Sequence, residues 1–113
     1  METVLRKRRR QLSSRRYNEA MKKLRPAAEY LYREGAKEVY LFGSILHPER
    51  FTEHSDLDFA VRGLDEAKHL EIEGKLADLL GDLEFDMLFL EEELCIRTDV
   101  LKRIREEAVL WKP

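Results

Sequence analysis

Three short runs rich in β-branched and aromatic residues constrain the fold of this chain more than any other feature. They are KEVYLFG at 37–43, DLDFAVR at 56–62 and EFDMLFL at 84–90. Runs of this length and composition, bounded by polar residues and glycine, predict β-strands. Segments with helical spacing of apolar residues lie before and between them, so we expect an α/β domain with a small β-sheet packed against helices.

The first predicted helix begins near Arg15, with Ser13 or Ser14 as its N-cap. A stripe of apolar residues then recurs at spacings of three and four, which is one face of a helix. Pro26 predicts either a kink or the start of a second helix, because proline removes a backbone donor and suits a first helical turn. Gly35 suits the left-handed position that follows a helix.

Two further helices are predicted later in the chain, at residues 65–80 and 98–107. Gly81 ends the first of them, and residues 108–111 predict a short final strand. The segment 44–55 reads as a loop with room for one helical turn. Cys95 is expected at a buried or boundary position, since a free cysteine usually behaves as a small apolar residue.

Charge is distributed unevenly along the 113 residues, although the net charge is only −2. Residues 1–25 hold ten Lys/Arg against two acidic residues, a net of +8, and the remaining 88 residues hold eleven against 21, a net of −10. We therefore divide the chain into a basic N-terminal arm at 1–16 and one domain at 17–113. The arm suits weak contact with nucleic acid or with an acidic partner surface, or is a solvated terminus; no aromatic residue lies among its arginines to stack on bases.

The compartment follows from what the sequence lacks. One cysteine forms no internal disulfide, and no apolar run approaches the roughly 20 residues that span a bilayer. We expect a cytoplasmic protein without membrane contact.

Three aspartates are the candidate catalytic and metal-binding residues. Asp56 and Asp58 are two apart on one predicted strand, so both side chains face the same side of the sheet. Asp86 interrupts the apolar run of the next predicted strand, where a lone charge is costly unless it is paired, exposed or bound to metal. If the two strands are neighbours, the three carboxylates form a cluster that suits two Mg²⁺ ions, or Mn²⁺, in phosphoryl-type transfer.

Gly43 and Ser44 follow the first predicted strand directly. Glycine lets a phosphate approach the backbone closely, and the turn after it presents N–H groups to that phosphate. Each of these signals is weak alone. Their order along the chain is far more specific than any one of them.

The segments YLFGS (40–44), SDLDFAV (55–61) and FDMLFL (85–90) resemble the nucleotidyltransferase domains of the DNA polymerase β superfamily. They are most similar to its minimal members, the antitoxins of HEPN/MNT toxin–antitoxin pairs. The resemblance covers about residues 26–111 and implies a nucleotidyltransferase fold with a mixed sheet. It also implies that Gly43 and Ser44 bind the nucleotide and that Asp56, Asp58 and Asp86 hold the metals.

The activity implied by the resemblance is Mg²⁺-dependent transfer of AMP from ATP to a hydroxyl, expected to be a tyrosine of the HEPN-type toxin partner. Two departures from the family pattern put the phosphate contacts in question. Eleven residues rather than ten separate Ser44 from Asp56, and no arginine follows Gly-Ser where family members often carry one.

Two other functions stay open. The chain is alternatively a weakly catalytic or non-catalytic antitoxin that neutralises its toxin by binding alone. A third reading is an enzyme that modifies a small hydroxylated molecule, but such enzymes usually carry a second domain for the acceptor. A length of 113 residues favours an acceptor held by a partner protein.

Overall fold

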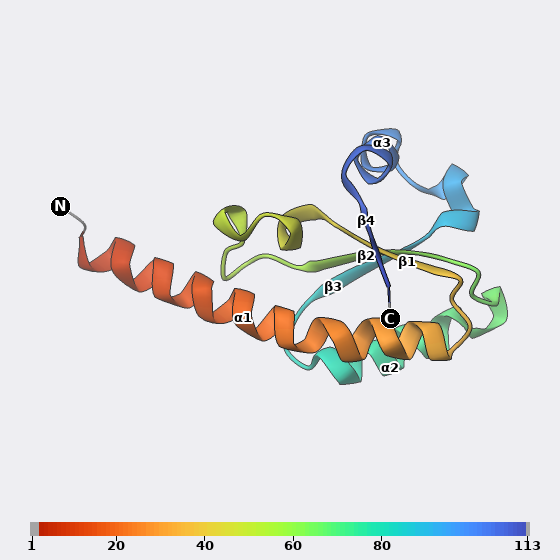
Figure 1. The fold of residues 1–113 in the computed structure, drawn as a ribbon, viewed down its shortest axis with the longest axis horizontal. Helices are drawn as coiled ribbons and strands as arrows, with labels where there is room; N and C mark the ends of the chain where they lie inside the picture. Colours follow the sequence, from red (N-terminus) through yellow and green to blue (C-terminus); the bar gives the residue numbers. More distant parts are fainter. Residues whose placement is uncertain (1–2, 113) are drawn as a thin grey trace.

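Four strands form one mixed sheet in the computed structural model, which describes residues 3–112. They are β1 (Glu38–Phe42), β2 (Leu57–Arg62), β3 (Phe85–Phe89) and β4 (Val109–Trp111), arranged in the order β3-β2-β1-β4 (Figure 1). β1 pairs antiparallel with both β2 and β4, whereas β2 and β3 are parallel. The expected fold class, a small mixed sheet packed against helices, is therefore confirmed.

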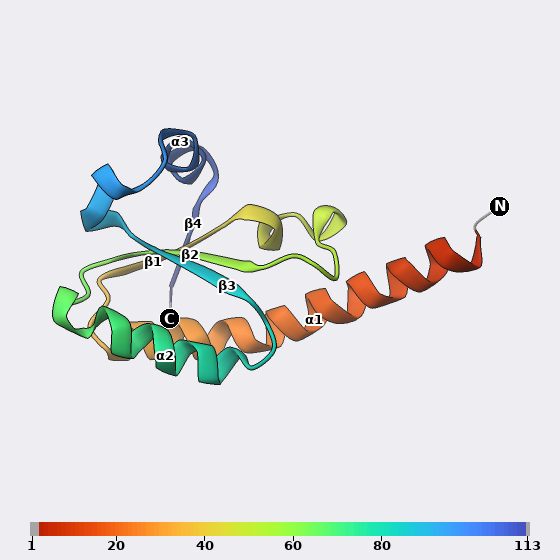
Figure 2. The same ribbon diagram turned by 180° about the vertical axis from the view of Figure 1, so that it is seen from behind.

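Two helices cover one face of this sheet. α1 (Val4–Arg33) and α2 (His69–Leu80) lie side by side beneath the strands in both views (Figures 1 and 2). α2 belongs to the crossover that parallel pairing of β2 and β3 requires. Leu57, Phe59 and Val61 alternate along β2, and all three are fully buried in this main core.

α3 (Thr98–Glu107) lies over the opposite face, as the two views agree (Figures 1 and 2). A smaller apolar cluster joins it to the sheet through Phe42, Ala60, Leu90 and Ile104. This cluster does not extend over the whole face, so the sheet has a fully apolar side and a second side that is only partly covered.

The start of α1 differs from its prediction. The helix begins at Val4, and the Thr3 side chain caps it by accepting a hydrogen bond of 3.2 Å from the Arg6 N–H. Ser13 and Ser14 lie inside the helix rather than at its N-cap. The physical reason is that Arg, Lys, Gln and Leu are all good helix formers, and no glycine or proline interrupts them. Because residues 4–16 continue into the domain as one helix, the division at 16/17 stays a prediction.

Pro26 does not divide α1. The helix runs through it as one element, with Pro26 exposed and the neighbouring Leu24, Ala27 and Ala28 buried. Packing on both sides of the proline offsets the backbone hydrogen bond that the ring removes. Gly35 follows the C-cap with a φ of 112°, as its predicted left-handed position requires.

The other boundaries differ by small amounts. α2 begins at His69 because a separate turn, Glu66–Lys68, precedes it, with the Asp65 carboxylate accepting a hydrogen bond of 3.1 Å from the Ala67 N–H. Two short turns, Gly43–Leu46 and Pro48–Arg50, occupy the segment after β1. Cys95 is exposed, so the predicted buried or boundary position was wrong; it ends the turn Leu90–Cys95 at the surface. In the described part of the chain, every helix is too short or too polar to cross a membrane.

Candidate active site

The register of β2 and β3 brings two aspartates together. Asp58 pairs with Asp86 across the parallel strands, and Phe42 of β1 pairs with Asp58 on its other side. Register partners point to the same face of a sheet, and neighbours along a strand point to opposite faces. Since Leu57 and Phe59 belong to the core under α1 and α2, Asp58 and Asp86 lie on the face that α3 partly covers.

Asp58 has the most perturbed carboxyl group of the site. Its side chain is partly buried, and this burial is the main reason that its pKa is raised from 3.8 to about 6. The negative charges of Asp86 and Asp56 raise the pKa further, whereas Arg103 of α3 lowers it. Asp86, which lies opposite and is exposed, therefore makes an isolated negative charge on Asp58 unfavourable. Binding either a proton or a cation to the Asp58 carboxylate would relieve this repulsion.

Asp56 lies just before β2, rather than inside the strand as predicted. Burial raises the pKa of Asp56, as do the charge of Glu84 and a hydrogen bond with it, while Arg16 has the opposite effect. The two segments are held together by the Leu57 N–H, which donates a hydrogen bond of 3.0 Å to the Glu84 carbonyl oxygen. Asp56 and Glu84 thus form a second carboxylate pair. Each lies two residues before its counterpart in the first pair, Asp58 or Asp86.

Gly43 packs directly against the first pair. It has a φ of 79°, in the left-handed region that favours glycine, and a Cβ added there would overlap the Asp58 oxygen Oδ2. Ser44 follows in the same turn, and the buried side chain of Ile45 anchors that turn to the core. The backbone thus approaches the Asp58 carboxylate as closely as a residue without a side chain allows.

The donor set fits a hard divalent cation by its chemistry. Carboxylate oxygens are the ligands that Mg²⁺ prefers, and a cation between Asp58 and Asp86 relieves the repulsion that raises the pKa of Asp58. Within residues 3–112, however, no three His, Cys, Asp or Glu side chains are arranged as a ready-made metal site. The structure brings Asp58 and Asp86 into one register pair, with Asp56 paired to Glu84 beside them.

Three charged residues near the carboxylates were missed in the sequence. Glu84 was detectable, because it precedes Asp86 by two residues and so shares its face of the strand. Arg103 and Arg16 were not, since their positions depend on how α3 and α1 pack against the sheet. A cleft of about 180 Å³ beside Asp56 is lined by residues from these segments, namely Arg16, Glu53, His54, Ser55, Asp56 and Glu84.

Comparison with known proteins places this geometry in a family context. The family model described as polymerase beta, nucleotidyltransferase matches residues 27–109, which include both carboxylate pairs and Gly43-Ser44. No curated protein matches the chain.

Solved structures share the fold. A structure described as a candidate minimal nucleotidyltransferase is 23% identical, with a TM-score of 0.63 over 82% of this chain and 93% of that one. A mutant of the toxin–antitoxin MntA-HpeT is 27% identical, with a TM-score of 0.55 over 75% of this chain and 68% of that one. A toxin–antitoxin structure with AMP-PNP is 23% identical, with a TM-score of 0.57 over 86% of this chain and 73% of that one.

Proposed function

Because the chain belongs to the polymerase beta nucleotidyltransferase family, we propose that it transfers AMP from ATP to a hydroxyl of a partner protein and acts as an antitoxin. The acceptor that we expect is a tyrosine of a HEPN-type toxin. In this proposal the protein works in the cytoplasm, where ATP is present and the exposed Cys95 thiol stays reduced.

The observation that carries the proposal is the pairing of Asp58 with Asp86 beside Gly43. Two carboxylates opposite each other on one face provide a place for cations that bind a triphosphate. The backbone at Gly43 lies directly against the Asp58 carboxylate, so a triphosphate held by cations on Asp58 would lie beside Gly43 and Ser44.

The proposed metal ligands are Asp56, Asp58 and Asp86, and the metal is Mg²⁺, with Mn²⁺ as a substitute. When bound, the cations supply charge neutralisation for the triphosphate and lower the pKa of the attacking hydroxyl. Asp58 is the central ligand, because the negative charges of both Asp86 and Asp56 act on its carboxyl group and raise its pKa.

The transfer exchanges one bond for another. The acceptor oxygen forms a bond to the α-phosphorus, the bond from that phosphorus to the bridging oxygen of pyrophosphate breaks, and the proton of the hydroxyl passes to solvent water. Asp86 is exposed, so an acceptor on another protein reaches this side of the pair directly. Gly43 and Ser44 position the triphosphate, and alignment of this kind accounts for much of the rate that such enzymes achieve.

Support for a protein acceptor comes from the neighbours in structure. Two of them are toxin–antitoxin structures, and one of these is described with AMP-PNP, a nucleoside triphosphate analogue. An antitoxin that modifies its toxin has the acceptor delivered by complex formation, so its own domain needs no acceptor pocket.

A second function is a binding antitoxin with little or no transfer activity. One observation favours it: the described residues 3–112 contain no ready-made group of three metal ligands. The segment after Gly43-Ser44 also has Ile45, Leu46 and His47 where the family often places an arginine. In that function the carboxylate pair would be a remnant, and inhibition would follow from covering the toxin.

Intact-mass spectrometry of the partner distinguishes the two. The protein is incubated with ATP, Mg²⁺ and the partner protein encoded by the adjacent gene, and the mass of the partner is then measured. We expect AMP-sized increments with the wild type and none with Asp58→Asn. The matched control is Asp78→Asn, which removes an exposed carboxylate from α2 and should leave the increments unchanged.

The possible outcomes distinguish the transfer reaction from binding alone. AMP-sized increments that persist with Asp58→Asn would contradict the assignment of Asp58 to the active site. A wild type that adds nothing, yet forms a stable complex that blocks the toxin, would contradict the transfer reaction and establish the binding antitoxin.

A further inference from the structure

The N-terminal half of α1 extends away from the domain. Nearly every residue from 4 to 15 is exposed. After them, Arg16 donates a hydrogen bond to the Asp82 carbonyl oxygen, and the Tyr17 ring packs against Phe51. The two ribbon views show this half running past the end of the sheet to the marked N-terminus (Figures 1 and 2). It gives the molecule its longest dimension, with extents of 52 × 29 × 22 Å. This half of the helix is therefore held in place from one end.

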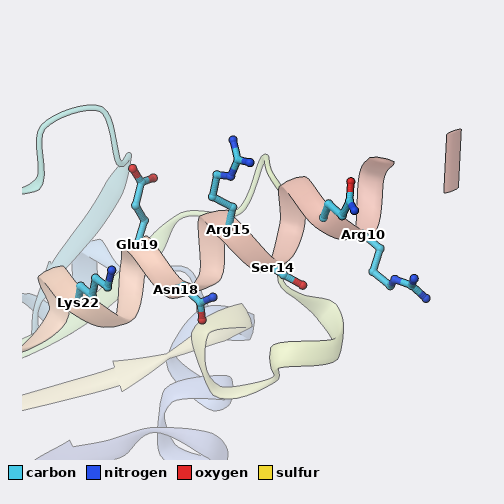
Figure 3. A pocket seen from close by; sticks show the side chains of 7 residues that line it. Arg10, Ser14, Arg15, Asn18, Glu19 and Lys22 are labelled. Carbon is cyan, nitrogen blue, oxygen red and sulfur yellow. The ribbon is translucent and has the colours of Figure 1, made fainter. Parts of the chain in front are cut away.

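Residues 4–15 carry six cationic side chains and no acidic one. They are Arg6, Lys7, Arg8, Arg9, Arg10 and Arg15. Successive residues of a helix are turned by about 100°, so the four from Arg6 to Arg9 alone point in four directions around the axis. Figure 3 shows Arg10 and Arg15 projecting to opposite sides of the helix. The positive charge thus surrounds the helix.

The domain does little to neutralise the four charges from Arg6 to Arg9. Arg16, which follows them, pairs with Glu19 of the same helix at 3.4 Å and with Asp82 of the domain at 3.6 Å. Within the described residues 3–112, no carboxylate lies at ion-pair distance from Arg6, Lys7, Arg8 or Arg9. Close cations on one helix repel each other, so a bound polyanion would stabilise this half.

We propose that residues 4–15 of α1 bind duplex DNA by lying in its major groove. That groove is about 12 Å wide and admits an α-helix, with phosphates on both of its walls. Twelve helical residues span about 18 Å, a length that fits within the groove. Charges on all sides of a helix are matched by a groove that encloses it. A protein surface would cover one side and leave the other cations without partners.

The apolar residues of this half do not favour a membrane. Val4, Leu5 and Leu12 are exposed, but the positions between Leu5 and Leu12 on the same helical face are Arg8 and Arg9. A helix that lies in a lipid interface needs a continuous apolar face, which this pattern interrupts. Contacts would be mainly to phosphates, so the binding that we infer is largely independent of base sequence.

Fluorescence anisotropy with a labelled mixed-sequence DNA duplex tests the proposal. The full chain is titrated at salt concentrations from about 50 to 200 mM, and the slope of log affinity against log salt counts the phosphate contacts at about 0.9 for each. Replacing three cations, Arg6→Gln with Arg8→Gln and Arg9→Gln, should weaken binding at least tenfold and reduce the slope by about 3.

The matched control removes three exposed cations from the domain half of the same helix, Lys22→Gln with Arg25→Gln and Arg33→Gln. It should keep both affinity and slope near those of the wild type. Asp58→Asn should also bind DNA normally, so failure of the transfer reaction does not affect this test.

Three results would overturn the proposal. One is the absence of duplex binding at the lowest salt, and another is an equal loss in the control variant. The third is a complex with the partner protein that loses affinity in the arm variant while duplex binding stays unchanged, which would assign the surface to a protein instead.

Discussion

The two faces of the sheet are built from the same strands and do different work. On the face under α1 and α2, Leu57, Phe59 and Val61 of β2 are completely buried. On the face under α3, the alternate residues of β2 are Asp58, Ala60 and Arg62, and only Ala60 is completely buried. One strand therefore supplies both the main core and the centre of the candidate site.

The difference shows how a small domain supports a costly arrangement of charge. Burial of apolar side chains stabilises by about 25 cal/mol for each Å² removed from water, and it is concentrated on one face. The other face holds two carboxylate pairs whose members repel each other. Strand alternation thus places the apolar side chains that stabilise the domain on one face and the carboxylates of the candidate site on the other. Substitutions on the first face should mainly lower the free energy of unfolding, and substitutions on the second should mainly change ligand binding and activity.

The largest effect on stability is expected on the apolar face. Leu76→Ala removes a fully buried side chain from α2 and should lower the free energy of unfolding by about 2–5 kcal/mol. Urea unfolding followed by circular dichroism measures it. The matched control, Leu79→Ala, truncates a leucine of the same helix that is 44% exposed and should cost less than about 1 kcal/mol. Equal costs for the two would remove the distinction between the faces.

Gly43 directly follows β1 and lies against the Asp58 carboxylate, so a change there should affect both stability and nucleotide binding. Gly43→Ala places a Cβ against the Asp58 carboxylate at a φ of 79°, so it should cost about 1–3 kcal/mol and reduce ATP binding at least tenfold. Calorimetry with ATP and Mg²⁺ measures the binding. Gly74→Ala is the control, because nothing lies within 4 Å of the added Cβ; in mid-helix it should stabilise by up to about 1 kcal/mol. Normal ATP binding by Gly43→Ala would show that this close approach does not matter.

The pKa of Asp58 predicts a pH dependence in the metal-free protein. The folded-state pKa is about 6, above the ordinary value of 3.8, so the folded state binds more protons between these values. The free energy of unfolding should therefore rise as the pH falls from about 7 to about 4.

Asp58→Asn removes that dependence. With an allowance for solvent screening of a partly exposed group, the variant should be more stable than the wild type by about 1 kcal/mol at about pH 8. The gap should close near pH 4, as urea unfolding across the pH range would show. A variant less stable than the wild type at high pH would contradict the repulsion between the carboxylates.

The smallest effect is expected at the second carboxylate pair. Glu84→Gln replaces a negative charge beside Asp56 by a neutral amide that can donate a hydrogen bond, so the pKa of Asp56 should fall toward its ordinary value. Carbon-detected NMR titration of the carboxyl groups measures this shift. An unchanged pKa would mean that burial alone raises it, and that Glu84 is not a partner of Asp56.

Local patterns along the chain predicted most of the fold. The strands are within one residue of their predicted ends, and helix 98–107 is confirmed as Thr98–Glu107, because β-propensity and helical spacing are properties of short segments. Placing Asp58 and Asp86 on one face needed only strand alternation and adjacent strands. Both conditions hold in the structure.

The features that were missed depend on packing. The approach of Arg103 to Asp58 follows from the position of α3, and that of Arg16 to Asp56 follows from how α1 packs against the sheet. The early start of α1 at Val4 was missed because a basic, polar segment has no apolar stripe, although its residues are good helix formers. Sequence patterns report what faces the core, and residues 4–15 face no core.

The most direct test of the central claim is to follow each phosphate of ATP. The protein and its partner are incubated with Mg²⁺ and ATP labelled at either the α- or the γ-phosphate, and label on the partner is measured after separation. Nucleotidyl transfer at Asp58 and Asp86 predicts that the α-label becomes bound to the partner, that the γ-label is released in pyrophosphate, and that Asp58→Asn transfers neither. Transfer of the γ-label, or retention of α-label transfer in Asp58→Asn, would contradict the account.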